Sequence, residues 1–182
     1  MFKKITLLGV LAMLCLNISA NSQENKPTNF NVWDMLPEQF WNTTHTAIKG
    51  GEQTTLQLSS YKGKFIILDF WALWCGACIG KFPLIDSLNH EFQDRLAIIG
   101  VNVKATRDTP SKINNLLEGK NRQQRAFKLH TIINDEQLLA SFPHKGIPFY
   151  VWINEKGKVV AITGSNMLNR SNVNSYLSPK QP

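Results

Sequence analysis

Two cysteines separated by two residues are the side chains of this sequence best suited to chemistry. They lie in the segment Trp71-Ala-Leu-Trp-Cys-Gly-Ala-Cys78, where a nearly all-apolar run gives way to helical spacing. A cysteine placed just before a helix lies near the unpaired backbone N–H groups of the first turn, which favour the thiolate and lower the thiol pKa. Cys75 is therefore the predicted nucleophile. Cys78, three residues on, lies on the same helical face and can close a disulfide with it.

The chemistry that this pair predicts is thiol–disulfide exchange. Attack by Cys75 on a substrate disulfide gives a mixed disulfide, which Cys78 resolves, while Trp74 shields one side of Cys75. Two other uses stay open. The first is a purely stabilising disulfide, although so small a loop removes little chain entropy. The second is zinc, which needs about four ligands, whereas the mature chain has no second cysteine pair and its histidines lack ligand spacing. We expect no metal and no cofactor.

Asp69 is a further candidate catalytic residue because it lies inside the apolar run, residues 65–71. Burying a carboxylate is costly unless the group is paired or neutral. Burial should therefore raise the pKa of Asp69 and let it exchange protons near neutral pH. We expect its carboxyl group beneath Cys78, where it could take the proton of the resolving thiol. The alternative is an aspartate at a strand edge that faces solvent.

Strands and helices are expected to alternate along the mature chain. The spacing of apolar residues predicts strands at residues 54–58, 65–71, 96–103, 129–133, 149–153 and 159–163. It predicts helices at residues 76–92, 108–117, 122–127, from 134 or 135 to 141, and 170–177, with a short helix or edge element within residues 32–41. Pro83 should kink its helix, and Asn134 or Asp135 and Asn169 are candidate caps. The pattern indicates an α/β domain with a mixed sheet.

The first twenty residues have the three parts of a secretory signal peptide: a basic start, an apolar stretch at residues 5–18 and a small residue at the end. A helix over that stretch spans about 21 Å, short of a bilayer core of about 30 Å. We predict a signal peptide at residues 1–20, a leader and N-terminal extension at 21–53 and a domain at 54–182. An uncleaved membrane tether at residues 5–18 stays open. The expected location is the periplasm or cell envelope, an oxidising compartment.

Length and charge limit the remaining classes of protein. The 182 residues suffice for one domain with a proper core, and the composition is not that of a disordered, collagen-like or coiled-coil chain. The formal net charge is +7, but the basic residues are scattered, with a mild cluster at residues 120–128. We interpret that cluster as a solvated helix face and expect no nucleic-acid partner.

The segment Asp69-Phe-Trp-Ala-Leu-Trp-Cys-Gly-Ala-Cys78 resembles the active-site motif of the thioredoxin superfamily. Pro83 resembles the kinking proline of that family's active-site helix. Gly146-Ile147-Pro148 resembles its cis-proline loop, and Gly164 resembles the glycine after its last strand.

The resemblance covers residues 56–177 and is strongest to one branch of the superfamily. The leader, residues 58–64 and the extra segment around residues 106–128 are similar to the exported TlpA/ResA branch. Residues 142–153 are similar to members of that branch from Bacteroidetes-type bacteria.

The resemblance implies a thioredoxin-like fold, a single domain whose mixed central sheet is flanked by helices. It also implies site residues: nucleophilic Cys75, resolving Cys78, a redox-active Cys75–Cys78 disulfide and proton-handling Asp69. The expected substrate-binding residues are Trp74, Gly76, Ala77, Ile147 and Pro148. Pro148 would be cis, leaving the backbone of Ile147 to pair with an extended substrate; an ordinary trans turn is the alternative. His144 and Lys145 are interpreted as solvated loop residues, with a place at the rim of the site as the alternative.

The function that we expect is that of an exported thiol–disulfide oxidoreductase, with reduction of protein disulfides as the favoured direction. Its partners would be client proteins with disulfides or thiols and a membrane electron donor. A disulfide-introducing oxidant stays open, because Gly76-Ala77 matches neither the Gly-Pro of reducing thioredoxins nor the Pro-His of the oxidant DsbA. A non-catalytic module that binds a peptide or a metal such as copper is the alternative from another class. A peroxidase is disfavoured, since no Thr-x-x-Cys-type site is found.

Overall fold

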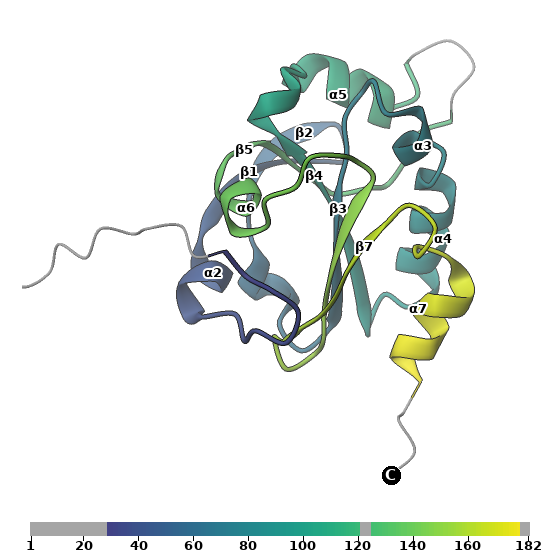
Figure 1. Cartoon of the computed structure of the whole chain (residues 1–182). Coiled ribbons are helices and arrows are strands. Elements are labelled where there is room, and N and C mark those ends of the chain that lie inside the picture. Colours follow the sequence, from purple (N-terminus) through teal and green to yellow (C-terminus); the bar gives the residue numbers. More distant parts are fainter. Residues whose placement is uncertain (1–28, 121–124, 179–182) are drawn as a thin grey trace, which may run out of the picture.

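Seven strands form one sheet that is covered by helices on both faces (Figure 1). The computed structural model describes residues 29–120 and 125–178. The strands are β1 (Thr44–Lys49), β2 (Glu52–Gln57), β3 (Phe65–Phe70), β4 (Leu96–Val103), β5 (Thr131–Asp135), β6 (Phe149–Ile153) and β7 (Val159–Gly164). The α-helices are α2 (Glu38–Asn42), α3 (Gly76–Ile79), α4 (Phe82–Glu91), α5 (Pro110–Leu117), α6 (Gln137–Ser141) and α7 (Arg170–Leu177). Two short 3₁₀ helices, η1 (Leu58–Tyr61) and η2 (Lys104–Thr106), complete the described elements.

The strand order is β2-β1-β5-β4-β3-β6-β7. β3, β4 and β5 are parallel, and the strands outside them pair antiparallel, so the sheet is mixed as predicted. Because β3 and β4 lie in the middle, every residue of both strands is buried. The carboxyl ends of the three parallel strands meet at one edge of the sheet, which is the usual place for a functional site in such sheets.

Each face of the sheet has its own hydrophobic core. On one face, β3 packs against α4, α5 and α7, and this core contains both Cys75 and Cys78. On the other face, the strands pack against α2, α6 and the segment before α2, with an aromatic group formed by Phe30, Phe40 and Phe142. The arrangement is a three-layer α/β/α fold, and the predicted fold class is confirmed.

The predicted helix at residues 76–92 is divided into α3 and α4. Pro83 lies in the first turn of α4, where its missing N–H would have no partner in any case. The chain therefore ends α3 at Ile79 and starts again at Phe82. A second difference concerns the predicted helix at residues 122–127: residues 122–124 lie outside the described residues, and 125–127 form no helix. Instead, the side chain of Arg125 contacts Asp86 in α4, and the backbone N–H of Phe127 donates to the carbonyl of Leu117 at the end of α5.

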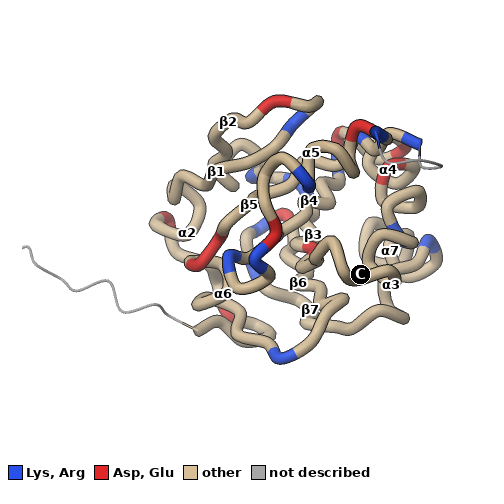
Figure 2. Tube along the Cα trace, turned by 90° about the horizontal axis from the view of Figure 1, so that it is seen from above, with Lys and Arg blue, Asp and Glu red and all other residues tan. Residues whose placement is uncertain are grey.

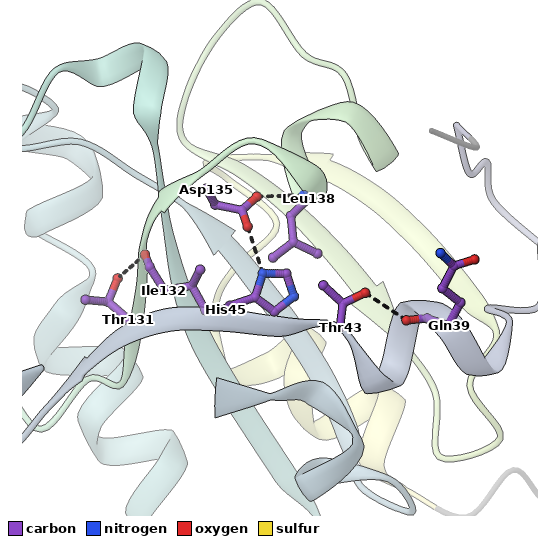
Figure 3. Close-up of polar contacts among 7 residues, drawn as sticks. All are labelled: Gln39, Thr43, His45, Thr131, Ile132, Asp135 and Leu138. Carbon is purple, nitrogen blue, oxygen red and sulfur yellow. Dashed lines mark hydrogen bonds and ion pairs between the residues drawn. The ribbon is translucent and has the colours of Figure 1, made fainter. Parts of the chain in front are cut away.

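Strand β1 was not predicted because its inward positions include a histidine. His45 and Asp135 are both buried, and His45 Nδ1 lies 2.8 Å from Asp135 Oδ2, joining β1 to the end of β5. The other oxygen of Asp135 accepts a hydrogen bond of 2.6 Å from the backbone N–H of Leu138 in the first turn of α6. Figure 3 shows the carboxyl group between the imidazole ring and this N–H. Asp135, one of the two predicted caps, thus supplies an acceptor to the first turn of α6, while the N-cap position itself is Glu136.

Charged residues of both signs are dispersed along the chain (Figure 2). The described ion pairs at the surface, such as Lys62–Glu38 and Lys104–Glu136, join neighbouring elements. Across residues 29–120 and 125–178, no helix is both long and apolar enough to cross a bilayer.

Replacing Asp135 by Ala should lower the free energy of unfolding by about 3–5 kcal/mol, because it leaves the buried His45 ring and the Leu138 N–H without their acceptor. Urea unfolding followed by circular dichroism measures this loss.

Glu136→Ala is the matched control, since Glu136 is the next residue in the chain and its carboxylate pairs with Lys104 at the surface. This change should cost less than about 1 kcal/mol. Equal, small losses in both variants would contradict a structural role for the buried pair.

Candidate active site

The two cysteines lie where β3 becomes α3, at the carboxyl edge of the parallel strands. Cys75 is the N-cap of α3, and its sulfur accepts a hydrogen bond of 3.2 Å from the backbone N–H of Cys78. The backbone N–H of Cys78, in the first turn of α3, thus lies next to the sulfur of Cys75. This geometry favours negative charge on Cys75 once the disulfide is reduced.

Cys75 and Cys78 form a disulfide, with their Cα atoms 5.3 Å apart. The two residues differ in exposure: Cys75 is 6% exposed, whereas Cys78 is fully buried at 0%. Trp74, immediately before the pair, is 68% exposed. Gly76 and Ala77 are also exposed, and a Cβ atom added at Gly76 would meet no atom within 4 Å. A substrate sulfur would therefore meet Cys75 first, on a surface bordered by Trp74.

The loop that leads to the cysteines is held by polar side chains from the end of β4 and the segment after it. One carboxylate oxygen of Asp108 accepts hydrogen bonds of 2.8 Å from the backbone N–H of Leu73 and from the side-chain amide of Asn102. Asn102 is fully buried, and it also donates to the backbone carbonyl of Trp71 at 3.3 Å. Thr106 donates to the amide oxygen of Asn102 at 3.0 Å. We call Asn102, Thr106 and Asp108 the loop anchor.

Trp71 fixes the other side of this loop. Its indole N–H donates to Thr131 Oγ1 at 2.8 Å, so the ring crosses β4 to reach β5. The crossing is possible because Gly100 has no side chain: a Cβ atom there would lie 2.9 Å from the indole nitrogen and 2.7 Å from Thr131 Oγ1. Both distances are too short for non-bonded atoms.

Asp69 is fully buried, and neither of its carboxyl oxygens has a hydrogen-bond partner among the described residues. It lies two residues after Ile67 in β3 and two residues before Trp71, which follows the strand, and the side chains of both belong to the core that contains the two cysteines. Because side chains two residues apart share a face of a strand, the carboxyl group faces the same layer as Cys78. Burial alone raises the pKa of Asp69 from its ordinary 3.8 to about 8.

The predicted cis-proline loop lies beside this layer. The Ile147–Pro148 peptide bond is cis, and both residues are partly exposed. Ile147 packs against the core that contains the two cysteines. The ring of His144 is stacked on Phe149 at a centroid distance of 4.4 Å and meets the edge of Phe70 at 4.7 Å. His144 is therefore packed against aromatic rings, in contrast to the solvated loop residue that was expected, whereas Lys145 is exposed.

The structure brings Cys75, Cys78 and Ile147 to one core, has Asp69 buried on the strand face that this core covers, and leaves Trp74, Gly76 and Ala77 exposed. Sequence reasoning did not find Asp108, Asn102 or Tyr150 as neighbours of this site. Asn102 and Tyr150 are polar residues within otherwise apolar strand segments, which was a usable signal in the sequence. Only the pairing of the strands shows which residues they lie beside. Within the described ranges, no group of three His, Cys, Asp or Glu residues could hold a metal ion.

The sequence is similar to one protein family and to individual bacterial proteins. The model of the AhpC/TSA family matches residues 42–162. The chain is 28% identical over 126 residues to the thioredoxin-like protein YneN of Bacillus subtilis, covering 66% of each chain. It is 27% identical over 129 residues to the thiol-disulfide oxidoreductase ResA of the same organism, covering 70% of this chain and 67% of ResA. The chain thus spans about two thirds of the length of these relatives.

Solved structures share the fold. The thioredoxin domain of a thiol-disulfide oxidoreductase from Bacteroides vulgatus superposes with a TM-score of 0.59 at 18% identity, covering 82% of this chain and all of that domain. The resemblance to the thioredoxin superfamily and to its ResA-like branch is confirmed, and these relatives support the prediction of a thioredoxin-like disulfide oxidoreductase.

The raised pKa of Asp69 makes stability depend on pH. Because the folded protein binds this proton more tightly than the unfolded chain, raising the pH from about 4 to about 8 should lower the free energy of unfolding. The slope from this group alone approaches about 1.4 kcal/mol per pH unit. The free energy of unfolding of the oxidised protein, measured with urea at several pH values, should depend less on pH in Asp69→Asn than in wild type. The exposed Asp94 supplies the control variant, Asp94→Asn; parallel curves for wild type and Asp69→Asn would contradict the assignment.

Removing the loop anchor should loosen the segment before Cys75. Asp108→Ala leaves the Leu73 N–H without its acceptor and removes one of the two acceptors of the Asn102 side-chain amide, which costs about 1–3 kcal/mol. Amide hydrogen exchange at Leu73 should become faster relative to exchange in β4. Unchanged protection at Leu73 would show that the anchor does not hold the loop.

Proposed function

Because the chain belongs to the AhpC/TSA family, we propose that it is an exported thiol–disulfide oxidoreductase that reduces disulfides in client proteins. The observation that carries this proposal is the Cys75–Cys78 disulfide at the start of α3. A disulfide that only stabilised the fold would close a loop too small to matter much for chain entropy. It would also have no need of a helix N-terminus that favours the thiolate.

In the proposed reaction, the reduced protein donates two electrons to a client disulfide. The thiolate of Cys75 attacks one client sulfur, a new S–S bond forms, and the second client sulfur leaves as a thiolate. The thiolate of Cys78 then attacks the sulfur of Cys75 in the mixed disulfide. This step forms the Cys75–Cys78 disulfide and releases the first client sulfur, so that the client holds two thiols.

Asp69 supports the second step by taking the proton of the Cys78 thiol. Cys78 is fully buried and lacks the helix N-terminal position that favours the thiolate of Cys75. A thiol in such surroundings needs a base. The pKa of Asp69, raised by burial to about 8, allows its carboxylate to accept that proton near neutral pH and later to release it.

The proposed client-binding surface consists of Trp74, Gly76, Ala77, Ile147 and Pro148. Trp74 offers a large exposed apolar surface beside Cys75, and Gly76 leaves room for an approaching chain. Ile147 and Pro148 are partly exposed, and the proposal is that an extended client segment pairs with the backbone there. Clients that bear disulfides or thiols follow from the family, and a membrane electron donor that returns the disulfide to the dithiol is part of the proposal.

The direction of electron flow is tested by the reduction potential of the Cys75–Cys78 couple. Equilibration with glutathione or dithiothreitol gives this potential. A value near or below about −250 mV supports the reductase, because thioredoxin lies near about −270 mV. A value near that of DsbA, about −120 mV, would instead support the disulfide-introducing oxidant.

Cys75→Ser should abolish the reduction of insulin disulfides, because it removes the attacking thiolate. Cys78→Ser should retain attack but accumulate a mixed disulfide with the client, since the resolving thiol is missing. Turbidity of reduced insulin measures the first result, and non-reducing gel electrophoresis measures the second.

Cys15 lies outside the described residues and in the predicted signal peptide, so the mature chain, residues 21–182, is the form to assay. Activity retained in Cys75→Ser would reject the oxidoreductase. A folded wild-type chain without any reversible redox couple would favour the non-catalytic binding module instead.

A further inference from the structure

Asp69 has a buried polar neighbour that the proposed reaction does not yet use. Tyr150 in β6 is fully buried, and its hydroxyl group, like both oxygens of Asp69, has no hydrogen-bond partner among the described residues. Buried polar groups without partners are uncommon in folded proteins, and each requires an explanation. The carboxyl group of Asp69 and the hydroxyl group of Tyr150 are therefore candidate hydrogen-bond partners of each other.

The sheet register places the two residues directly opposite each other. β3 and β6 are antiparallel, and Asp69 is the cross-strand partner of Tyr150. Side chains in such a pair leave the same face of the sheet, with Cβ atoms about 4.5–5.5 Å apart. The face is that of the cysteines, because Tyr150 belongs to the core that contains Cys75 and Cys78.

The charge on Asp69 acts on Tyr150. Burial raises the pKa of the Tyr150 hydroxyl, and the negative charge of Asp69 raises it further. The hydroxyl therefore keeps its proton through the whole range in which Asp69 titrates. A neutral tyrosine can donate a hydrogen bond to a carboxylate, whereas an ionised carboxylate can only accept.

Other groups around Asp69 do not supply such a donor. On the opposite side of β3, its cross-strand neighbour in β4 is Gly100, which has no side chain. From α3 the facing groups are the two disulfide-bonded cysteines. At the start of α4, the ammonium group of Lys81 donates to the carbonyl of Leu168, and within α4 the carboxylate of Asp86 accepts from the backbone of Lys128. Burial alone accounts for the raised pKa of Asp69, so no cation of the described residues offsets it.

We propose that Tyr150 is a positioning residue for the proton of Asp69, its hydroxyl group donating to the carboxylate whenever Asp69 is ionised. This inference rests on the proposed function and deepens it. When Cys78 loses its proton to Asp69, the carboxylate becomes a neutral carboxyl group, which is a weaker acceptor for Tyr150. When Asp69 releases the proton, the stronger, charge-assisted hydrogen bond forms again. Tyr150 keeps its own proton throughout. By stabilising the ionised form, it lowers the pH above which Asp69 can act as the base for Cys78.

Tyr150→Phe tests this role because it removes the hydroxyl group and nearly conserves the volume of the side chain. In the oxidised protein, the carboxyl carbon of Asp69 can be titrated by ¹³C NMR. The midpoint should rise by about one pH unit or more, a tenfold weaker acid, because a hydrogen bond to a charged group is lost. An unchanged or lower midpoint would overturn the proposal. Tyr61→Phe is the matched control, since it removes a hydroxyl group that lies 3.0 Å from His130 Nδ1, and it should leave the midpoint unchanged.

A second measurement needs no change at Tyr150, in case the Phe variant folds poorly. In the wild-type protein, the ring carbon that bears the hydroxyl of Tyr150 should show a chemical-shift transition with the midpoint of Asp69. This transition should disappear in Asp69→Asn. A signal that is flat over the same range in wild type would overturn the coupling.

These titrations use the disulfide form and require no turnover, so their outcome is independent of the Cys75→Ser assay. If wild type fails to reduce insulin disulfides, the proposed function fails, whatever the midpoints are. If wild type is active and Tyr150→Phe titrates like wild type, the inference about Tyr150 alone fails. If both proposals hold, the rate at which Cys78 resolves the mixed disulfide should increase with pH, and the midpoint of this increase should lie about one pH unit higher in Tyr150→Phe than in wild type.

Discussion

Complete burial of β3 is the constraint on which the rest of the site depends. This strand lies in the middle of the sheet with an apolar layer on each face, and all six of its residues are buried. The side-chain carboxyl group of Asp69 in this strand is therefore in a low-dielectric medium that disfavours its charged form. The C-terminal end of the strand leads to the cysteines at the edge of the sheet. The same burial that stabilises the fold makes Asp69 able to exchange a proton in the neutral range.

The site is held from three directions that are distant in sequence. The loop anchor after β4 fixes the backbone before Cys75, the indole of Trp71 reaches across Gly100 to β5, and β6 presents Tyr150 and the cis-proline loop. The loop anchor and Tyr150 come from the two strands that pair with β3 and the segment after β4, whereas Trp71 ties the end of β3 to β5, one strand further away. The position of the cysteines is thus a property of the sheet, while the short helix α3 supplies the local field at the sulfur of Cys75.

How much the sequence could predict depended on whether the signal was local. The buried strand β4 and the helix α7 have the predicted bounds, because a nearly all-apolar run and an asparagine cap are visible in single segments. Strand β1 was missed because His45 at an inward position reads as polar until Asp135, ninety residues away, is known to face it. Asp108 and Tyr150 were missed for the same reason: their importance comes from partners across the sheet. The motif around Cys75 and Cys78 could be read directly, since its residues are contiguous.

The missing side chain at Gly100 limits how this centre could change by mutation. Any substitution there would push a Cβ atom into the indole of Trp71 and the hydroxyl of Thr131, so β4 cannot readily supply a charged neighbour to Asp69. On the opposite side of β3, position 150 already carries a full-sized side chain. Substitutions that change the pKa of Asp69 through a neighbouring strand are therefore more readily accommodated in β6. A library of variants aimed at new redox properties should accordingly vary β6 and not β4.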